Sequence, residues 1–364
     1  MELIGMTRRA FATGLTAPLI LGAQDKAGTK APVIGEGDQK YEWIDNWGTL
    51  PSNIKWGNTH NVVEDSQGNM YVHHTVYADS ESSDSMVVFD GKGKFIRSWG
   101  PEYKGCAHGM MIRKEGSTEF LYLTVNAAPK GVTPPPAGAA SVVKTTLSGE
   151  VVWKVHGPPD IDRYRVPVGT PPVLPAYNPT NLAVAPNGDV YVADGYGSYY
   201  VNHYNSKGEY LNTFGGRGSD PGLLREPHGI WMDMRSGSPI LTVADRRNNR
   251  LQRFTLDGKH IDFVPGFRLP CHFNIHPTNN TVVIPELNNA ALVVDKDNKI
   301  IATLGDPAAP NAPSPNAKRT ERDRSKFIPG IFVNPHGACF DHNGDIFVAE
   351  WVEIGRVTKL RKVA

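Results

Sequence analysis

Short apolar strands separated by polar turns recur along the chain at intervals of about forty residues. The clearest copies are residues 179–196 (PTNLAVAPNGDVYVADGY), 227–247 (PHGIWMDMRSGSPILTVADRR) and 335–351 (PHGACFDHNGDIFVAEW). Each copy has an apolar strand, a turn containing Gly or Asn, and a β-branched strand that ends in Ala-Asp or Ala-Glu. Further strand-turn-strand patterns follow the first two copies, at 203–215 and 251–264. The repeat therefore predicts a four-stranded antiparallel unit, the blade of a β-propeller.

Weaker copies of the same pattern account for the rest of the chain. They cover residues 59–100, begin again at 106, and cover 270–305. Together the copies predict an all-β fold, a six-bladed β-propeller, over residues 41–364. The last copy runs out at 356–363, one strand short of a blade. We therefore expect residues 41–47 (YEWIDNW) to supply its outer strand and close the ring, which leaves only short, protected sheet edges.

Two segments interrupt the period and are expected to be insertions, at 126–177 and 306–330. Both are too long for ordinary connections and too rich in proline for helices. Long insertions at one end of a propeller often act as lids over a site. A solvated spacer is an equal alternative for 306–330, which is polar and carries charges of alternating sign.

Residues 1–23 are expected to be a signal for export rather than part of the fold. Arg8 and Arg9 precede a weakly apolar stretch that is too short to span a bilayer, in a pattern resembling the bacterial twin-arginine signal. A disordered basic tail is the alternative. With residues 24–40 as a linker, the propeller is predicted to be exported to the periplasm or the outside, with no membrane span after the signal is removed.

The charge balance narrows the class of partner. The formal net charge is +1 and the sequence has no basic blocks, so it gives little attraction toward nucleic acid or an anionic membrane. A small-molecule substrate and a monomer are expected. The three cysteines are an odd number and predict no complete disulfide framework.

Histidine recurs where the innermost strand of a blade begins. Aligning the six blades on that position gives His60, His108, Thr180, His228, Cys271 and His336. Blades two, four and six lie about 120° apart in such a ring, so His108, His228 and His336 are expected to converge on the axis. Three imidazoles with an open fourth position suit a catalytic zinc ion. The alternative is that Pro-His-Gly is only a repeated turn preference, although Thr180 and Cys271 show that the fold does not require histidine there.

A second register brings two more side chains to the same mouth of the channel. In an antiparallel blade the end of the second strand returns to the mouth where the first strand began, and this places Tyr196 and Arg246 above the histidines. A phenol beside a metal ion can act as a base, and an arginine can bind a carboxylate through two hydrogen bonds. In the alternative interpretation, Tyr196 packs on the rim and Arg246 pairs with Asp245 or a neighbouring blade.

At these residues the sequence resembles the peptidyl-α-hydroxyglycine α-amidating lyases, over nearly all of the chain after residue 23. The resemblance is carried by AHG at 107–109, by residues 178–196, by EPHG at 226–229 with VADRRNNRLQRF at 243–254, and by NPHG at 334–337. It implies a six-bladed propeller of NHL-type repeats with zinc on His108, His228 and His336. It also implies that Tyr196 is the base and that Arg246 lines the substrate site. The implied reaction cleaves a carbinolamide and releases an amide and a glyoxylate-type product.

Three positions depart from the family pattern. Thr75 stands near the position of a second family arginine and is a substrate-binding candidate. The family's calcium-binding aspartate is Gly337, so calcium has no support here. His60 adds a fourth histidine that can ligate metal, bind substrate or crowd the site, and Arg247 is a further substrate-binding candidate. Two other functions stay open: a non-catalytic propeller that binds a protein or glycan partner, and a lactonase-like propeller hydrolase.

Overall fold

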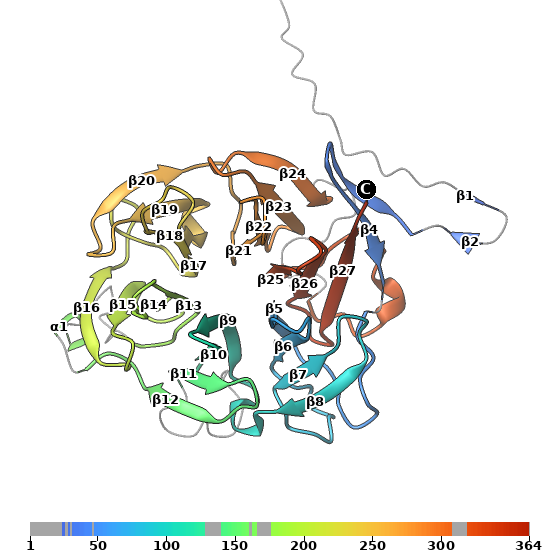
Figure 1. The fold of residues 1–364 in the computed structure, drawn as a ribbon, viewed down its shortest axis with the longest axis horizontal. Helices are drawn as coiled ribbons and strands as arrows, with labels where there is room; N and C mark the ends of the chain where they lie inside the picture. Colours follow the sequence, from blue (N-terminus) through green and yellow to red (C-terminus); the bar gives the residue numbers. More distant parts are fainter. Residues whose placement is uncertain are drawn as a thin grey trace, which may run out of the picture.

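The computed structural model describes residues 24–25, 28–29, 31–45, 47–127, 140–159, 162–165, 176–307 and 319–363. Their strands form a closed ring of six blades around a central axis (Figure 1), which confirms the predicted six-bladed β-propeller. The expected export signal at 1–23 lies outside the described residues. Within these ranges the helices are α1 (Asp162–Arg165) and three single 3-10 turns, and none is long and apolar enough to cross a membrane.

Each blade is an antiparallel sheet whose strands follow one another from the axis outward. Blade one contains β5 (Thr59–Glu64), β6 (Met70–His74), β7 (Met86–Phe89) and β8 (Phe95–Trp99). Blade two contains β9 (Ala107–Glu115), β10 (Thr118–Val125), β11 (Ser141–Thr146) and β12 (Val151–Val155). Blade three contains β13 (Asn181–Val184), β14 (Val190–Ala193), β15 (Tyr200–Tyr204) and β16 (Tyr210–Gly215).

The second half of the ring continues in the same order. Blade four contains β17 (Pro227–Asp233), β18 (Ile240–Asp245), β19 (Arg250–Phe254) and β20 (His260–Val264). Blade five contains β21 (Asn274–Ile275), β22 (Val282–Glu286), β23 (Ala290–Val294) and β24 (Ile300–Gly305). Blade six contains β25 (Pro335–Phe340), β26 (Ile346–Glu350) and β27 (Arg356–Lys362), followed by β4 (Gln39–Ile44) and β3 (Val33–Glu36). A separate pair joins β1 (Gln24–Asp25) to β2 (Gly28–Thr29).

Burial along the strands follows from the stacking of the blades. The middle strands are covered on both faces by neighbouring blades, so β26 is buried at every residue, whereas the outer strand β8 is half-buried or exposed throughout. Gly188 and Gly344, in the turns between the first and second strands of blades three and six, have φ values of 91° and 83°. Only glycine adopts this region without strain, which explains the recurrent Asn-Gly turns of the sequence.

The ring is closed as predicted by an N-terminal strand. β4 pairs antiparallel with β27, with Trp43 opposite Leu360. The expected linker at 24–40 needs a correction, because β3 lies within it and pairs with β4 as a fifth strand. β3 forms here because it buries an apolar side chain: Ile34 lies in the same buried cluster as Tyr41 and Trp43.

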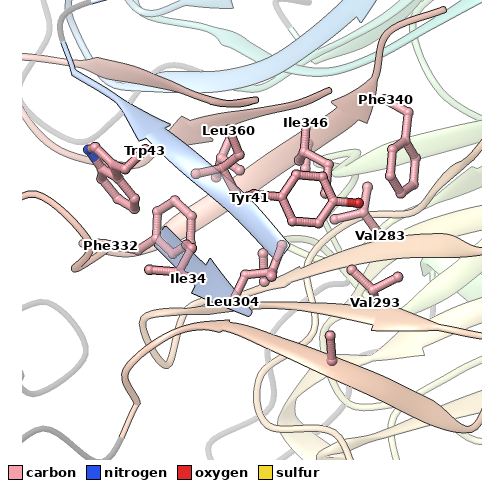
Figure 2. Packing of buried hydrophobic residues seen from close by; sticks show 14 residues of the cluster. Ile34, Tyr41, Trp43, Val283, Val293, Leu304, Phe332, Phe340, Ile346 and Leu360 are labelled. Carbon is pink, nitrogen blue, oxygen red and sulfur yellow. The ribbon is translucent and has the colours of Figure 1, made fainter. Parts of the chain in front are cut away.

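This N-terminal cluster joins blades five and six (Figure 2). Trp43 is 1% exposed, and its ring centroid lies 4.7 Å from that of Phe332. Tyr41 lies near Val283 of blade five and Ile346 of blade six in the same buried group. Burying such large rings stabilises a fold by several kcal/mol, about 1.5–3 kcal/mol for each fully buried side chain. The closing strand therefore fastens the ring by packing as well as by hydrogen bonds.

The expected insertion at 126–177 also needs a correction. It contains β11 and β12, the outer strands of blade two, so this blade is complete. The buried Val142 and Val143 mark β11 as a genuine blade strand, but Pro-rich stretches flank the hairpin and hide its period. In the second expected insertion, 306–330, the described residues include the 3-10 turn η3 (Arg324–Lys326).

Candidate metal centre

Four histidines meet at one mouth of the axial channel, and each lies in the innermost strand of a blade. The ring centroids of His108, His228 and His336 are 4.7–4.9 Å apart, and the ring of His60 lies 4.8 Å from those of His108 and His336. All four side chains are buried, with at most 6% of their surface exposed. The alignment of the blades therefore brings together side chains that are up to 276 residues apart in the sequence.

The histidines of blades two, four and six are each held by a backbone carbonyl of the next blade. Nδ1 of His108 lies 2.5 Å from the carbonyl oxygen of Thr180, and Nδ1 of His228 lies 2.7 Å from that of Cys271. Nδ1 of His336 lies 2.9 Å from the carbonyl oxygen of His60. A carbonyl can only accept, so Nδ1 carries the proton in each ring and Nε2 keeps its lone pair. Metal-binding histidines are oriented in this way.

The glycine after each of these histidines makes the contact possible. A Cβ atom on Gly109 would lie 2.5 Å from the carbonyl oxygen of Thr180, and one on Gly337 would lie 2.5 Å from that of His60. On Gly229 it would lie 2.7 Å from the carbonyl oxygen of Cys271. These are the same three oxygens that accept from the histidines. His-Gly recurs because the imidazole needs a neighbouring carbonyl that only a residue without Cβ lets close enough.

His60 is positioned differently from the other three. It is followed by Asn61, and its Nδ1 is buried with no hydrogen-bond partner among the described residues. The ligand atoms of His60, His108 and His336 nevertheless lie within 4.8 Å of one another. Two sets of three histidines thus share His108 and His336, one completed by His60 and one by His228. The carbonyl contact, which fixes the tautomer of His228 and not that of His60, favours the set with His228.

The chemistry of the cluster fits a metal ion. Burial lowers the pKa of His108 to about 3, and burial with the charge of nearby Arg246 lowers the pKa of His228 far below its usual value. The rings are therefore neutral at pH 7, as metal binding requires. Nε2 of His336 is buried without a hydrogen-bond partner in the described structure. Neutral imidazoles with unprotonated Nε2 atoms turned toward one another are a donor set that suits zinc.

Tyr196 lies over the cluster, where the sequence register places it. Its hydroxyl is 3.2 Å from Nε2 of His108 and 3.1 Å from Nε2 of His228. The residue as a whole is 37% exposed, but its hydroxyl lies among these groups, and burial raises the pKa of Tyr196. The guanidinium of Arg246, whose Nη2 donates to the hydroxyl at 3.3 Å, acts in the opposite direction and favours the phenolate.

Arg246 is already paired within the protein. Its Nε donates to Oε1 of Glu226 at 2.8 Å, and its Nη2 donates to the same oxygen. Arg247, whose side chain is 58% exposed, pairs with the other oxygen of Glu226 at 2.9 Å. The partner is therefore Glu226 rather than Asp245. Glu226 was not among the residues predicted for the site, although it is the first residue of EPHG. The sequence did contain a signal for it: a carboxylate in the same motif as the predicted ligand His228.

Thr75 has a hydrogen-bonding role in blade one. Its hydroxyl accepts from the backbone N–H of Asn58 at 3.0 Å, and its own N–H donates to the carbonyl of Asn58. No interaction found among the described residues joins Thr75 to the histidine cluster. A cavity of about 180 Å³ between the inner strands is lined mainly by apolar side chains such as Met110, Ile230 and Phe273, together with the polar His272 and Asn274.

Together these features define a six-bladed β-propeller with a histidine cluster, a tyrosine and a paired arginine at one mouth. No family model matches the chain. It is 26% identical over 230 residues to peptidyl-alpha-hydroxyglycine alpha-amidating lyase 1 of Drosophila melanogaster, covering 56% of this chain and 38% of that protein. It is 26% identical over 179 residues to peptidyl-glycine alpha-amidating monooxygenase A of Xenopus laevis, covering 48% of this chain and 17% of that protein.

These matches confirm the resemblance: the chain is a lyase-like propeller, and its match spans less than half the length of either relative. Solved structures share the fold alone. A gluconolactonase from Xanthomonas campestris superposes with a TM-score of 0.56 at 12% identity, covering 95% of this chain and 98% of that one. Virginiamycin B lyase from Staphylococcus aureus gives 0.53 at 13% identity, covering 89% and 100%.

Proposed function

We propose that the protein is an exported, zinc-dependent lyase that cleaves the C–N bond of a small carbinolamide substrate such as an N-acyl α-hydroxyglycine. One observation carries the proposal: three histidines from alternate blades, each held by the same backbone contact, converge beneath the hydroxyl of Tyr196. The similarity to amidating lyases supports the class of reaction. Export is proposed from Arg8 and Arg9, and replacing both with lysine is expected to keep the protein in the cytoplasm.

Zinc would be held by Nε2 of His108, His228 and His336, where it supplies Lewis acidity to a substrate oxygen. Tyr196 would take the proton of the substrate hydroxyl onto its phenol oxygen, and Arg246, which donates to that oxygen, would favour the phenolate that does so. As the hydroxyl proton leaves, the carbon–oxygen double bond forms and the C–N bond breaks. The nitrogen leaves with the electron pair and takes the proton that Tyr196 had accepted, which returns the phenol to its starting state. An N-acyl α-hydroxyglycine thus gives an amide and glyoxylate.

The metal assignment is tested by elemental analysis of wild-type protein and two matched variants. About one zinc per chain is expected in the wild type and in His60→Ala, and none in His228→Ala. Loss of zinc in His60→Ala with retention in His228→Ala would instead assign the metal to His60, His108 and His336. Circular dichroism of each variant shows whether the fold is retained.

The reaction is tested by measuring glyoxylate released from an N-acyl α-hydroxyglycine, with an aldonolactone as the comparison substrate. Glyoxylate release that needs bound zinc is the expected result. Hydrolysis of the lactone alone would favour the lactonase-like alternative, since the fold is shared with a gluconolactonase. A zinc-free protein that acts on neither compound would indicate a binding propeller.

A further inference from the structure

A second arginine lies at the mouth of the channel, and it comes from the segment between blades five and six. The guanidinium carbon of Arg319 lies 4.0 Å above the ring of Trp351. The backbone carbonyl of Arg319 accepts from the N–H of Glu353 at 2.8 Å, which holds the segment against the end of blade six. The ring of Trp351 in turn lies 6.5 Å from that of His336. Arg319 is therefore held beside the histidine cluster by a stacked aromatic ring.

The register of the blades explains why Trp351 reaches this mouth. Trp351 directly follows Ala-Glu at the end of β26, just as Arg246 directly follows Ala-Asp at the end of β18. The two residues are equivalent in blades six and four, so both lie at the mouth where the histidines converge. Blade four supplies its cation from the strand end itself. Blade six supplies an aromatic ring there, and Arg319 adds the cation from the connecting segment.

The charge of Arg319 lacks a direct partner in the described part of the chain. Its Nε is buried and makes no hydrogen bond, and none of the described carboxylates forms an ion pair with it. The nearby Glu353 is paired with Arg322 at 2.7 Å. Arg246, by contrast, is neutralised by Glu226. Arg319 is thus the cation at this mouth that keeps its hydrogen-bonding capacity for a ligand.

The charge of Arg319 also acts on His60, in the neighbouring blade one. Burial is the main cause that lowers the pKa of His60, and the charge of Arg319 adds to this shift. Burial also lowers the pKa of Arg319 itself, while the charges of Glu353 and Tyr196 oppose that effect. A guanidinium that is partly removed from water binds an anion more strongly than one on an open surface. Buried polar groups normally have partners, and the buried Nε of Arg319 has none among the described residues.

We propose that Arg319 binds the carboxylate of an acidic substrate at the mouth of the channel and makes the enzyme prefer carboxylates over the corresponding amides. A planar guanidinium binds a carboxylate through two parallel hydrogen bonds. Stacking on Trp351 holds the guanidinium of Arg319 in place before the substrate binds. The inference rests on the proposed function, which supplies a substrate with a carboxylate next to the bond that breaks.

Kinetics with a matched pair of substrates test the assignment. In Arg319→Gln, KM for an N-acyl α-hydroxyglycine is expected to rise about 10-fold to 100-fold, while its carboxamide analogue is cleaved as before. Arg319→Lys should recover part of the lost affinity for the acid, because lysine keeps the positive charge but cannot make the two parallel hydrogen bonds. Lys326→Gln, which removes an exposed cation of the same segment that pairs with Glu321 and not with Glu353, is the control and should change neither substrate. Equal losses for the acid and the amide, or no loss, would overturn the assignment.

A binding measurement separates this inference from the proposed reaction. Calorimetry with an N-acylglycine and its carboxamide, neither of which can be cleaved, should show tighter binding of the acid to wild type and equal binding to Arg319→Gln. That result in a protein without lyase activity would retain the anion site and refute the reaction. Lyase activity with equal binding of both probes to wild type would retain the reaction and refute the role of Arg319.

Discussion

The close approach of the innermost strands at the histidines makes Gly229→Ala an informative substitution. The added Cβ would lie 2.7 Å from the carbonyl oxygen of Cys271 and 3.0 Å from its carbonyl carbon, both of which are backbone atoms that no rotamer change can move. Reaching an ordinary contact of 3.4 Å requires a shift of about 0.7 Å between the two strands. The hydrogen bond from Nδ1 of His228 to the same oxygen, now 2.7 Å, would lengthen beyond the usual limit of about 3.2 Å.

Two consequences are expected from this substitution. Overpacking should lower the free energy of unfolding by about 1–3 kcal/mol. Loss of the contact that orients His228 should weaken zinc binding by about 10-fold to 100-fold. Denaturant unfolding of the metal-free protein measures the first effect, and competition with a chromophoric chelator measures the second.

The matched control for Gly229→Ala is Gly91→Ala. This glycine lies in an outer turn, where a Cβ would meet its nearest neighbour, the carbonyl oxygen of Gly68, at 3.3 Å. It should change neither property. Unchanged zinc affinity and unchanged stability in Gly229→Ala would show that the strands can part without cost, and the explanation of the His-Gly pattern would then be wrong.

Tyr196→Phe should lower kcat for glyoxylate release about 100-fold or more with zinc still bound, and an unchanged kcat would remove the phenol from the reaction. Trp43→Ala should lower the free energy of unfolding by about 3–5 kcal/mol in a denaturant titration, against less than about 0.5 kcal/mol for the exposed Ile96→Ala; equal effects would contradict the role of the closing strand. Burial lowers the pKa of His74 from 6.5 to about 3, so as the pH falls the unfolded chain binds a proton at this histidine before the folded chain does. The metal-free protein should therefore lose about 2 kcal/mol through this group as the pH falls from 7 to 5, and His74→Gln should reduce that slope of stability against pH.

The fold could be predicted largely because its information is local. Every blade repeats the same alternation and turn, and the last blade is visibly one strand short, so both the ring and its closing strand follow from the sequence. The hairpin β11–β12 was missed because its proline-rich flanks break the period. β3 was missed because four residues give too short a pattern, and its burial depends on packing against Trp43 and Phe332, which lie at opposite ends of the chain.

The candidate site likewise has residues that the repeat predicts and one residue that it does not. The histidines and Tyr196 stand at fixed register positions in the repeat, so alignment of the blades was enough to bring them to one mouth. Arg319 could not be placed in this way, because it lies outside the repeat. Its position depends on the path of a connecting segment and on a single aromatic ring, Trp351. The register of the repeat predicts which side chains the blades bring to the site, whereas the conformation of the connecting segments determines which additional side chains reach it.

The same register explains why His60 differs from the other three histidines. The blades alternate between donors and acceptors: blades two, four and six donate from a histidine ring, and blades one, three and five accept with a backbone carbonyl. An accepting blade uses only its main chain in this contact, so its side chain is free to vary, and Thr180, Cys271 and His60 all occur there. His60 belongs to an accepting blade, and its carbonyl serves His336 whatever side chain the residue carries. His60→Thr should therefore keep zinc bound, whereas Thr in place of His336 should release it.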